Sequence, residues 1–263
     1  MSTKRSLFIN TFIFLLLVFL CIACFVKYQN QSTSTKKETK NHTNYNVQPN
    51  TYQGNLVKHT YYTLSYSEKH EQAEWVAYHL KPAYLIKNTE RKDNFKSDPL
   101  VKTGSAQLSD YRNSGYDRGH LLPSADMAFS EQANSETFYL SNMSPQEASF
   151  NRGVWKQLEE QVRDYVIERG ELFIITGPVL TDSLKEIGSN GVDVPEYYYK
   201  IIADIDSSTI KTVAYLLKNE KSDLELERFI VSIDSIETMT HIDFFVDFPD
   251  SLEAIFESKK SLF

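Results

Sequence analysis

Cysteine is almost absent from this sequence, which contains only Cys21 and Cys24 among its 263 residues. Because no cysteine follows Cys24, the rest of the chain folds without disulfide bonds. Also absent are the glycine-rich patterns that bind dinucleotides or nucleotide phosphates, and the Cys/His spacings that hold structural zinc. These absences exclude nucleotide-cofactor enzymes and zinc-stabilised modules.

A long uncharged hydrophobic segment, residues 7–26, follows two basic residues near the N-terminus. Its twenty residues would form a helix about 30 Å long, which is roughly the thickness of a bilayer core. We expect residues 1–27 to form an uncleaved membrane anchor that holds the protein outside the cytoplasm. Two alternatives stay open: lipid attachment at Cys24, which follows Ala23, or cleavage as a signal segment and secretion.

The next segment, residues 28–50, is rich in Gln, Ser, Thr, Lys and Asn and is predicted to be a polar linker. The first 50 residues carry six basic side chains and one acidic side chain, a net charge of +5. Because the whole chain has a formal net charge of −7, residues 51–263 have a net charge of −12. An acidic domain does not coat nucleic acid through its overall charge. A nuclease built on it would need a local basic groove and a bound metal.

Residues 51–263 contain no internal repeat and no second linker, which predicts one domain. Runs rich in β-branched and aromatic residues predict strands at 59–66, 74–80, 172–177, 197–205 and 212–218. Apolar residues repeat every four positions from Val154 to Val166, which predicts a helix from Asn151 to about Glu168. Asp234, as N-cap, and Glu237 form a capping-box pattern that predicts a second helix. The mixture of elements predicts an α+β fold.

The stretch GYDRGHLLP, residues 115–123, brings Asp117, Arg118 and His120 together beside a glycine that permits close backbone approach. A neutral histidine can accept a proton from water near pH 7, and an arginine can hold phosphate oxygens through paired donors. The pattern therefore suits phosphodiester hydrolysis. An alternative is a turn with an Asp–Arg salt bridge and a surface histidine.

A second polar stretch, residues 141–163, leads into the predicted helix. Asn151 lies at the helix start, where its side-chain oxygen suits Mg²⁺, and Glu159 falls about 80° around the helix axis from it. Both side chains can therefore face one cleft. The alternatives are that Asn151 is a plain N-cap and that Glu159 and Arg163 form an exposed ion pair.

The segments DRGH, SNMSPQ, FNRGVW and LEEQVR together resemble the DNA/RNA non-specific endonucleases of the ββα-metal (His-Me finger) class, which include secreted bacterial nucleases and mitochondrial endonuclease G. Further segments resemble the family in the same order, and the likeness covers most of residues 56–257. These segments are WVAYHL (75–80), FKSDP (95–99), ITGPVL (175–180), VPEYYYKIIA (194–203) and FIVSIDSIE (229–237). The resemblance implies a mainly antiparallel central sheet flanked by helices, with a ββα-metal motif.

The resemblance also implies roles for individual residues. His120 would be the general base, Asn151 the protein ligand of one Mg²⁺ that Mn²⁺ can replace, and Arg118 a phosphate contact. Glu159 would orient water bound to the metal. Two further positions, Asn142 and Arg163, would support the site.

The upstream arginine of the family matches Arg91 only loosely, because the local spacing differs. Gln146 and Trp155 also match motif positions, although burial or helix packing accounts for them equally well. The implied activity is cleavage of DNA and RNA through contacts to the phosphate backbone, leaving 5′-phosphate ends. A non-catalytic binding module and a phosphoesterase for small diesters are the alternatives. The oligomeric state is not fixed by the sequence, and a homodimer stays open.

Overall fold

The computed structural model describes residues 47–49, 53–205 and 210–261. The predicted membrane anchor and nearly all of the predicted linker lie outside these ranges. Among the residues that the structure describes, no helix has the length and apolar character needed to cross a membrane.

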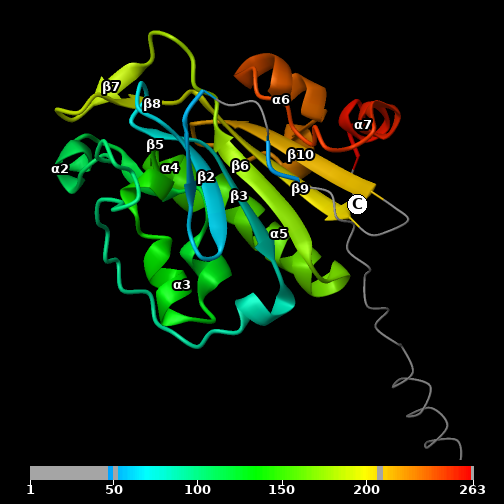
Figure 1. Cartoon of the computed structure of the whole chain (residues 1–263), viewed down its shortest axis with the longest axis horizontal. Helices are drawn as coiled ribbons and strands as arrows, with labels where there is room; N and C mark the ends of the chain where they lie inside the picture. Colours follow the sequence, from blue (N-terminus) through cyan, green and yellow to red (C-terminus); the bar gives the residue numbers. More distant parts are fainter. Residues whose placement is uncertain (1–46, 50–52, 206–209, 262–263) are drawn as a thin grey trace, which may run out of the picture. The chain divides into compact units, whose positions relative to one another are not determined.

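Seven strands of the described chain form one antiparallel sheet, which confirms the α+β fold class (Figure 1). In spatial order they are β1 (Asn55–Lys58), β2 (Tyr62–Ser67), β3 (Gln72–Leu80), β6 (Leu172–Pro178), β9 (Tyr197–Ile205), β10 (Ile210–Lys218) and β11 (Ile230–Val231). The strands predicted at 74–80, 172–177, 197–205 and 212–218 are therefore confirmed. The strand predicted from residue 59 begins instead at Tyr62, because the backbone amide of His59 donates to the carbonyl of Tyr62 at 2.9 Å and closes a turn.

Side chains alternate between the two faces of the sheet, as the pleat of a β-strand requires. On β9, Tyr198 and Ile202 belong to one apolar cluster, and Tyr199 and Ile201 belong to the other. The first cluster includes the apolar residues of α5 (Lys156–Arg169), and the second includes residues of α6 (Ile233–Thr240) and α7 (Asp250–Glu257). The sheet is thus covered by helices on both faces (Figure 1).

A separate two-stranded unit carries the predicted motif. Strand β4 (Asp117–His120) pairs with β5 (Met143–Gln146) in antiparallel register, with His120 opposite Met143. The chain then continues through α4 (Ala148–Phe150), a π-helical turn η4 (Asn151–Trp155) and α5. The helix predicted from Asn151 is present, but Gly153 has φ −106° and ψ −114°, so the helix is kinked there. Two strands followed by a helix form the ββα unit.

The shorter elements connect these layers. They are η1 (Pro82–Leu85), α2 (Leu108–Tyr111), η2 (Ser124–Met127), α3 (Glu131–Glu136), η3 (Leu140–Asn142), β7 (Lys185–Ile187), β8 (Val192–Val194) and η5 (Leu226–Phe229). The helix predicted near residue 234 is α6, but its N-cap is Ser232, whose side chain accepts from the backbone amide of Ser235 at 3.3 Å. The prediction of Asp234 as N-cap was wrong, because Ser232 is the residue with extended backbone before the first turn.

Candidate active site

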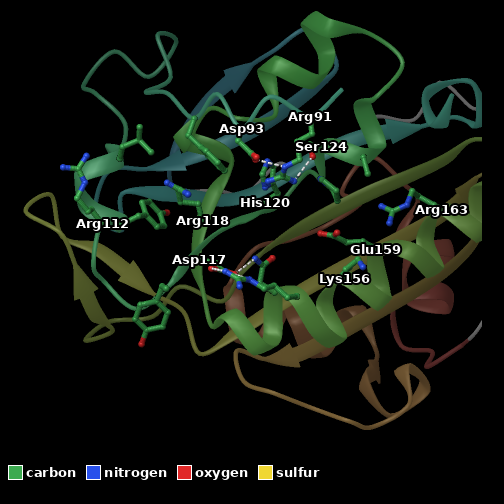
Figure 2. A pocket seen from close by; sticks show the side chains of 18 residues that line it. Arg91, Asp93, Arg112, Asp117, Arg118, His120, Ser124, Lys156, Glu159 and Arg163 are labelled. Carbon is green, nitrogen blue, oxygen red and sulfur yellow. Dashed lines mark hydrogen bonds and ion pairs between the residues drawn. The ribbon is translucent and has the colours of Figure 1, made fainter. Parts of the chain in front are cut away.

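A cavity of about 1020 Å³ opens between the ββα unit and the loops that follow η1 and α2. Arg118 and His120 of β4, Asn151 of η4, and Glu159 and Arg163 of α5 all line it. Figure 2 shows Arg118 and His120 on the strand side of the cavity, and Glu159 and Arg163 on the helix side. The structure therefore brings five of the six predicted site residues together.

His120 lies at the end of β4 in an aromatic environment. Its ring contacts Phe138 edge-on, with centroids 4.9 Å apart, and lies 5.8 Å from the ring of Phe95. The side-chain Nε2 is buried and has no hydrogen-bond partner among the described residues. Burial, followed by the charges of Arg91 and Arg118, lowers the pKa of His120 to about 3. The imidazole is therefore neutral at pH 7, as a proton acceptor must be.

Gly119, between Arg118 and His120, is required by the packing beneath the motif. A Cβ atom at this position would lie 2.1 Å from the side chain of Gln146, which is buried on the neighbouring strand β5, opposite Asp117. The sequence predicted a close approach at this glycine, and the neighbour is the Gln146 side chain. Gln146 therefore has a packing role and does not line the cavity.

Asp117 ties the helix start to β4. The side-chain amide of Asn151 donates to Asp117 Oδ2 at 2.9 Å, and the guanidinium of Arg152 donates to both carboxylate oxygens at 2.8 and 2.7 Å. Partial burial raises the pKa of Asp117, but the hydrogen bonds from Arg152 and Asn151 outweigh it and leave the pKa below its ordinary value. Asp117 thus pairs with Arg152, and the Asp117–Arg118 salt bridge considered as an alternative is not formed.

The contact with Asp117 fixes how the Asn151 amide is oriented. Because its nitrogen donates to Asp117, the side-chain oxygen is left available on the cavity side. The alternative of a plain N-cap does not apply, since Asn151 has helical backbone angles and its side chain bonds across to β4. An amide oxygen and the nearby Glu159 carboxylate are hard donors of the kind that Mg²⁺ prefers, so the residues present fit such an ion.

Arginines surround the histidine. The Arg118 guanidinium stacks over the Phe95 ring, 4.2 Å from its centroid. Arg91 lies over the Phe138 ring at 5.1 Å and donates to Ser124 Oγ at 3.1 Å (Figure 2). Arg91 matched the family only loosely in sequence, yet it lines the same cavity. Its irregular loop offers no periodicity from which this position was predictable.

Glu159 and Arg163 do not form the i,i+4 ion pair that the sequence left open. Arg163 instead donates to Asp126 Oδ1 at 3.0 Å, and the Tyr78 hydroxyl donates to Asp126 Oδ2 at 3.0 Å. Asp126 is almost fully buried, with 1% of its surface exposed. Asp126 was not predicted, because a single acidic residue within the short turn η2 has no recognisable spacing from the motif residues.

Lys200 lies in the core beneath this part of the cavity. It is in the centre of β9, 1% exposed, with its ammonium 4.8 Å from the centroid of the Trp155 ring and donating to Thr176 Oγ1 at 3.3 Å. Trp155 and Glu159 lie one helical turn apart on the same side of the helix. Burial lowers the pKa of Lys200, and the negative charges of Glu159 and Asp126 oppose that shift.

The same cluster determines the charge state of Glu159. Burial raises its pKa, Lys200 opposes that shift most strongly, and Asp126 adds to it. Two carboxylates, Asp126 and Glu159, are thus balanced by two cations, Lys200 and Arg163. Lys200 was not predicted from the sequence. The only signal was a charged residue at an inward position of the alternating run YYYKIIADI.

Asn142, the sixth predicted residue, is fully buried and does not line the cavity. Its side chain accepts from the backbone amide of Leu122 at 2.9 Å and donates to the carbonyls of Leu122 and Thr137 at 3.0 and 2.8 Å. These bonds hold the backbone that follows His120. Asn142 therefore acts on the site through the position of β4.

The cavity is more positive than the domain around it. Six cationic side chains and three carboxylates line it, although the domain is acidic overall. A local basic groove, which the sequence required of a nuclease, is therefore present. The cations are Arg91, Arg112, Arg118, Arg152, Lys156 and Arg163.

A histidine on a two-stranded unit, an amide oxygen at the start of its helix and a basic cavity are together the arrangement of a ββα-metal nuclease. The sequence pattern of the family described as DNA/RNA non-specific endonuclease matches residues 40–251. The chain belongs to this family and is an endonuclease of the metal-dependent hydrolase type.

Known relatives agree. A nuclease of Nostoc sp. is 33% identical over 216 residues, which are 78% of this chain and 78% of that protein. Human mitochondrial endonuclease G is 34% identical over 67% of this chain, and the matched part is 64% of its own length. The mitochondrial nuclease EXOG of Danio rerio is 34% identical over 71% of this chain and 60% of its own length. The chain thus covers less than two thirds of the two mitochondrial relatives.

A solved structure has the same fold. The crystal structure of a complex of EndoG with EndoGI, described as showing the mechanism of EndoG inhibition, matches with a TM-score of 0.70 and 31% identity. The match covers 76% of this chain and 89% of that chain.

Proposed function

We propose that the protein hydrolyses phosphodiester bonds of DNA and RNA with Mg²⁺, without sequence preference, and leaves 5′-phosphate ends. The observation that carries this proposal is that a neutral, buried His120 and the side-chain oxygen of Asn151 line the same basic cavity. Arginine side chains suit contacts to phosphate oxygens, which do not distinguish base sequence.

His120 accepts the proton of the attacking water in this mechanism. A pKa of about 3 makes it a weak base in the free site, and Arg91 and Arg118 contribute to that low value after burial. A substrate phosphate held by these two arginines offsets their charge, which raises the basicity of His120 when substrate is bound. Arg91 and Arg118 therefore bind substrate and adjust the base.

The remaining groups would hold the metal ion and orient the water around it. Asn151 is the residue that would hold Mg²⁺, and the ionised Glu159 would orient the water around the ion. Bound Mg²⁺ would supply the positive charge that stabilises the phosphate and the departing 3′-oxygen. Arg163 is fixed by Asp126 at 3.0 Å, so it adds a cation of constant position to the wall of the cavity.

We also propose that the protein is anchored outside the cytoplasm by residues 7–26, with residues 28–50 as the linker and residues 51–263 as the nuclease domain. The length of the uncharged segment supports this proposal. The full chain should fractionate with membranes, and external protease should remove the nuclease domain. Incorporation of labelled fatty acid that is lost in Cys24→Ala would favour lipid attachment at Cys24, and recovery as soluble external protein would favour secretion.

The activity is tested with the purified full chain in mild detergent. We expect it to degrade both plasmid DNA and RNA in Mg²⁺, and to lose this activity when EDTA is present in excess. Phosphatase-sensitive 5′ ends should appear on the products. Undiminished cleavage in EDTA would contradict the metal mechanism. Binding of nucleic acid without cleavage would identify a non-catalytic binding module. Cleavage of small phosphodiesters but not of nucleic acid would identify a phosphoesterase.

A further inference from the structure

Helices α6 and α7 lie side by side against the sheet face opposite to α5 (Figure 1, orange and red). Acidic side chains gather where they meet. One carboxylate oxygen each from Asp234 and Glu237 of α6 and Glu257 of α7 lie within 4.8 Å of one another. None of these residues lines the nuclease cavity.

Glu257 is the unusual member of this group. Only 6% of it is exposed, and its Oε1 is buried without a hydrogen-bond partner. Glu253, one turn earlier on α7, also has a buried Oε1 without a partner. A buried carboxylate oxygen that lacks a donor is costly, because it has lost its water and gained nothing in return. Two such oxygens at one contact point to a missing positive group.

The protein itself supplies little positive charge there. Glu237 accepts one hydrogen bond, from the backbone amide of Phe244 at 2.9 Å. Within the described ranges, no salt bridge involves the acids of this contact. Six acidic residues lie on α6, on α7 and on the segment between them: Asp234, Glu237, Asp243, Asp250, Glu253 and Glu257. The basic or titratable groups that follow the two helices are His241, Lys259 and Lys260.

The charge state of the group follows from its burial. Burial, together with the neighbouring acids, raises the pKa of Glu257 to about 9. Burial also raises the pKa of Glu237 to about 7, although the hydrogen bond from the Phe244 amide opposes the shift. A cation bound between these carboxyl groups would offset their mutual repulsion. Asp234 is exposed, which leaves a path for water and ions to reach the buried oxygens.

We propose that Asp234, Glu237 and Glu257 bind a divalent cation of the Ca²⁺ type, which ties α6 to α7. Ca²⁺ takes six to eight oxygen ligands in flexible geometry, so three carboxylates together with waters on the Asp234 side suit it. The site is structural and independent of the nuclease reaction. It stabilises the helical cover of one sheet face.

The test measures Ca²⁺ binding and thermal unfolding in the full chain, kept in mild detergent. Asn151→Ala serves as the background, because it removes the proposed catalytic ligand and leaves this site as the one under study. Calorimetric titration should show binding of one Ca²⁺ with release of protons, since the ion displaces them from the raised carboxyls. At about a hundredfold excess over Kd, Tm should rise by about 5–10 °C relative to EDTA.

Glu257→Gln gives a prediction of opposite sign in the two conditions. In EDTA it should keep or raise Tm, because it removes a buried charge from a repulsive group. In Ca²⁺ it should lose most of the Tm rise and of the heat of binding. Asp250→Asn is the matched control, an exposed acid at the start of the same helix, and it should keep the full Ca²⁺ response.

Two results would overturn the proposal. One is a Ca²⁺ response that is equal in the Asn151→Ala background and in its Glu257→Gln derivative. The other is the absence of any binding, with Tm falling from pH 6 to pH 9 equally in Ca²⁺ and in EDTA. The carboxyls would then share protons and bind no ion. Because neither measurement uses nuclease activity, this outcome is separate from failure of the proposed function.

Discussion

Replacement of Lys200 by methionine tests whether the buried cluster beneath the cavity holds Glu159 in its working state. Methionine retains an unbranched side chain of similar length against Trp155 and removes the charge. Asp126 and Glu159 would then be balanced by Arg163 alone. Removing one partner from a buried ionic group costs about 3–5 kcal/mol, because it leaves an uncompensated charge. For a domain of this size, the corresponding fall in Tm is roughly 6–20 °C.

The cost depends on pH, which separates a charge effect from a packing effect. Burial already raises the pKa of Glu159, and loss of Lys200 raises it further. A carboxyl with a raised folded-state pKa binds its proton more tightly when folded, so its stabilising contribution is lost as pH rises through that pKa. The variant should therefore approach wild-type stability near pH 5 and fall well below it at pH 7.5. Activity should decline at a higher pH than in the wild type as the solution is acidified.

The assays are thermal unfolding between pH 5 and pH 8 and the pH–rate profile for plasmid cleavage. The double variant Lys200→Met/Glu159→Gln should regain much of the stability without regaining activity. Lys211→Met is the matched control, since Lys211 is an exposed lysine on the adjacent strand β10. A loss of stability that is the same at every pH, or a pH–rate profile identical to wild type, would refute the reasoning.

Three further predictions concern the cavity. His120→Ala should lower the cleavage rate by about 10²–10⁴-fold at all Mg²⁺ concentrations. Asn151→Ala should recover part of its lost activity when the Mg²⁺ concentration is raised. Equal rescue of both variants would show that base and ligand are misassigned. Gly119→Ala should cost about 1–3 kcal/mol in a denaturant titration, because its Cβ would lie 2.1 Å from Gln146, and Gln146→Ala should offset part of this cost. Because the pKa of His120 is about 3, the acidic decline in rate should follow Glu159 and flatten in Glu159→Gln; an unchanged decline would assign it elsewhere.

The predictable part of the site is its contiguous part. Residues 117–163 contain both strands of the ββα unit and the first half of its helix. The site residues on these elements therefore lie close together in the sequence and form a recognisable motif. Likewise, long runs with clear periodicity predicted four strands of the central sheet and the helix that became α5. The kink at Gly153 was not predicted, because Gly153 precedes the apolar repeat that begins at Val154 and does not disturb it.

The remaining site residues have no spacing that connects them with the motif. Arg91 lies in an irregular loop and Lys200 in the middle of a hydrophobic strand, both outside residues 117–163, and Asp126 lies within that stretch in the short turn η2. Only the packing of β9 beneath α5 shows that Lys200 and Glu159 belong to one electrostatic group. Asn142 illustrates the reverse case, since its place in the motif did not reveal that it bonds to backbone rather than facing the cavity.

The electrostatics of the cavity explain how an acidic domain can act on a polyanion. Charges separated by more than about 8 Å are largely screened at physiological ionic strength, so the net charge of −12 on residues 51–263 opposes the approach of substrate only weakly. Among the cations that line the cavity, Arg152 is paired with Asp117 and Arg163 with Asp126, so carboxylates partly neutralise these two charges and fix their positions. Arg118 instead stacks on Phe95, a contact that fixes its direction without neutralising its charge. The proposed function therefore relies on short-range contact with one phosphate rather than on a broad positive surface.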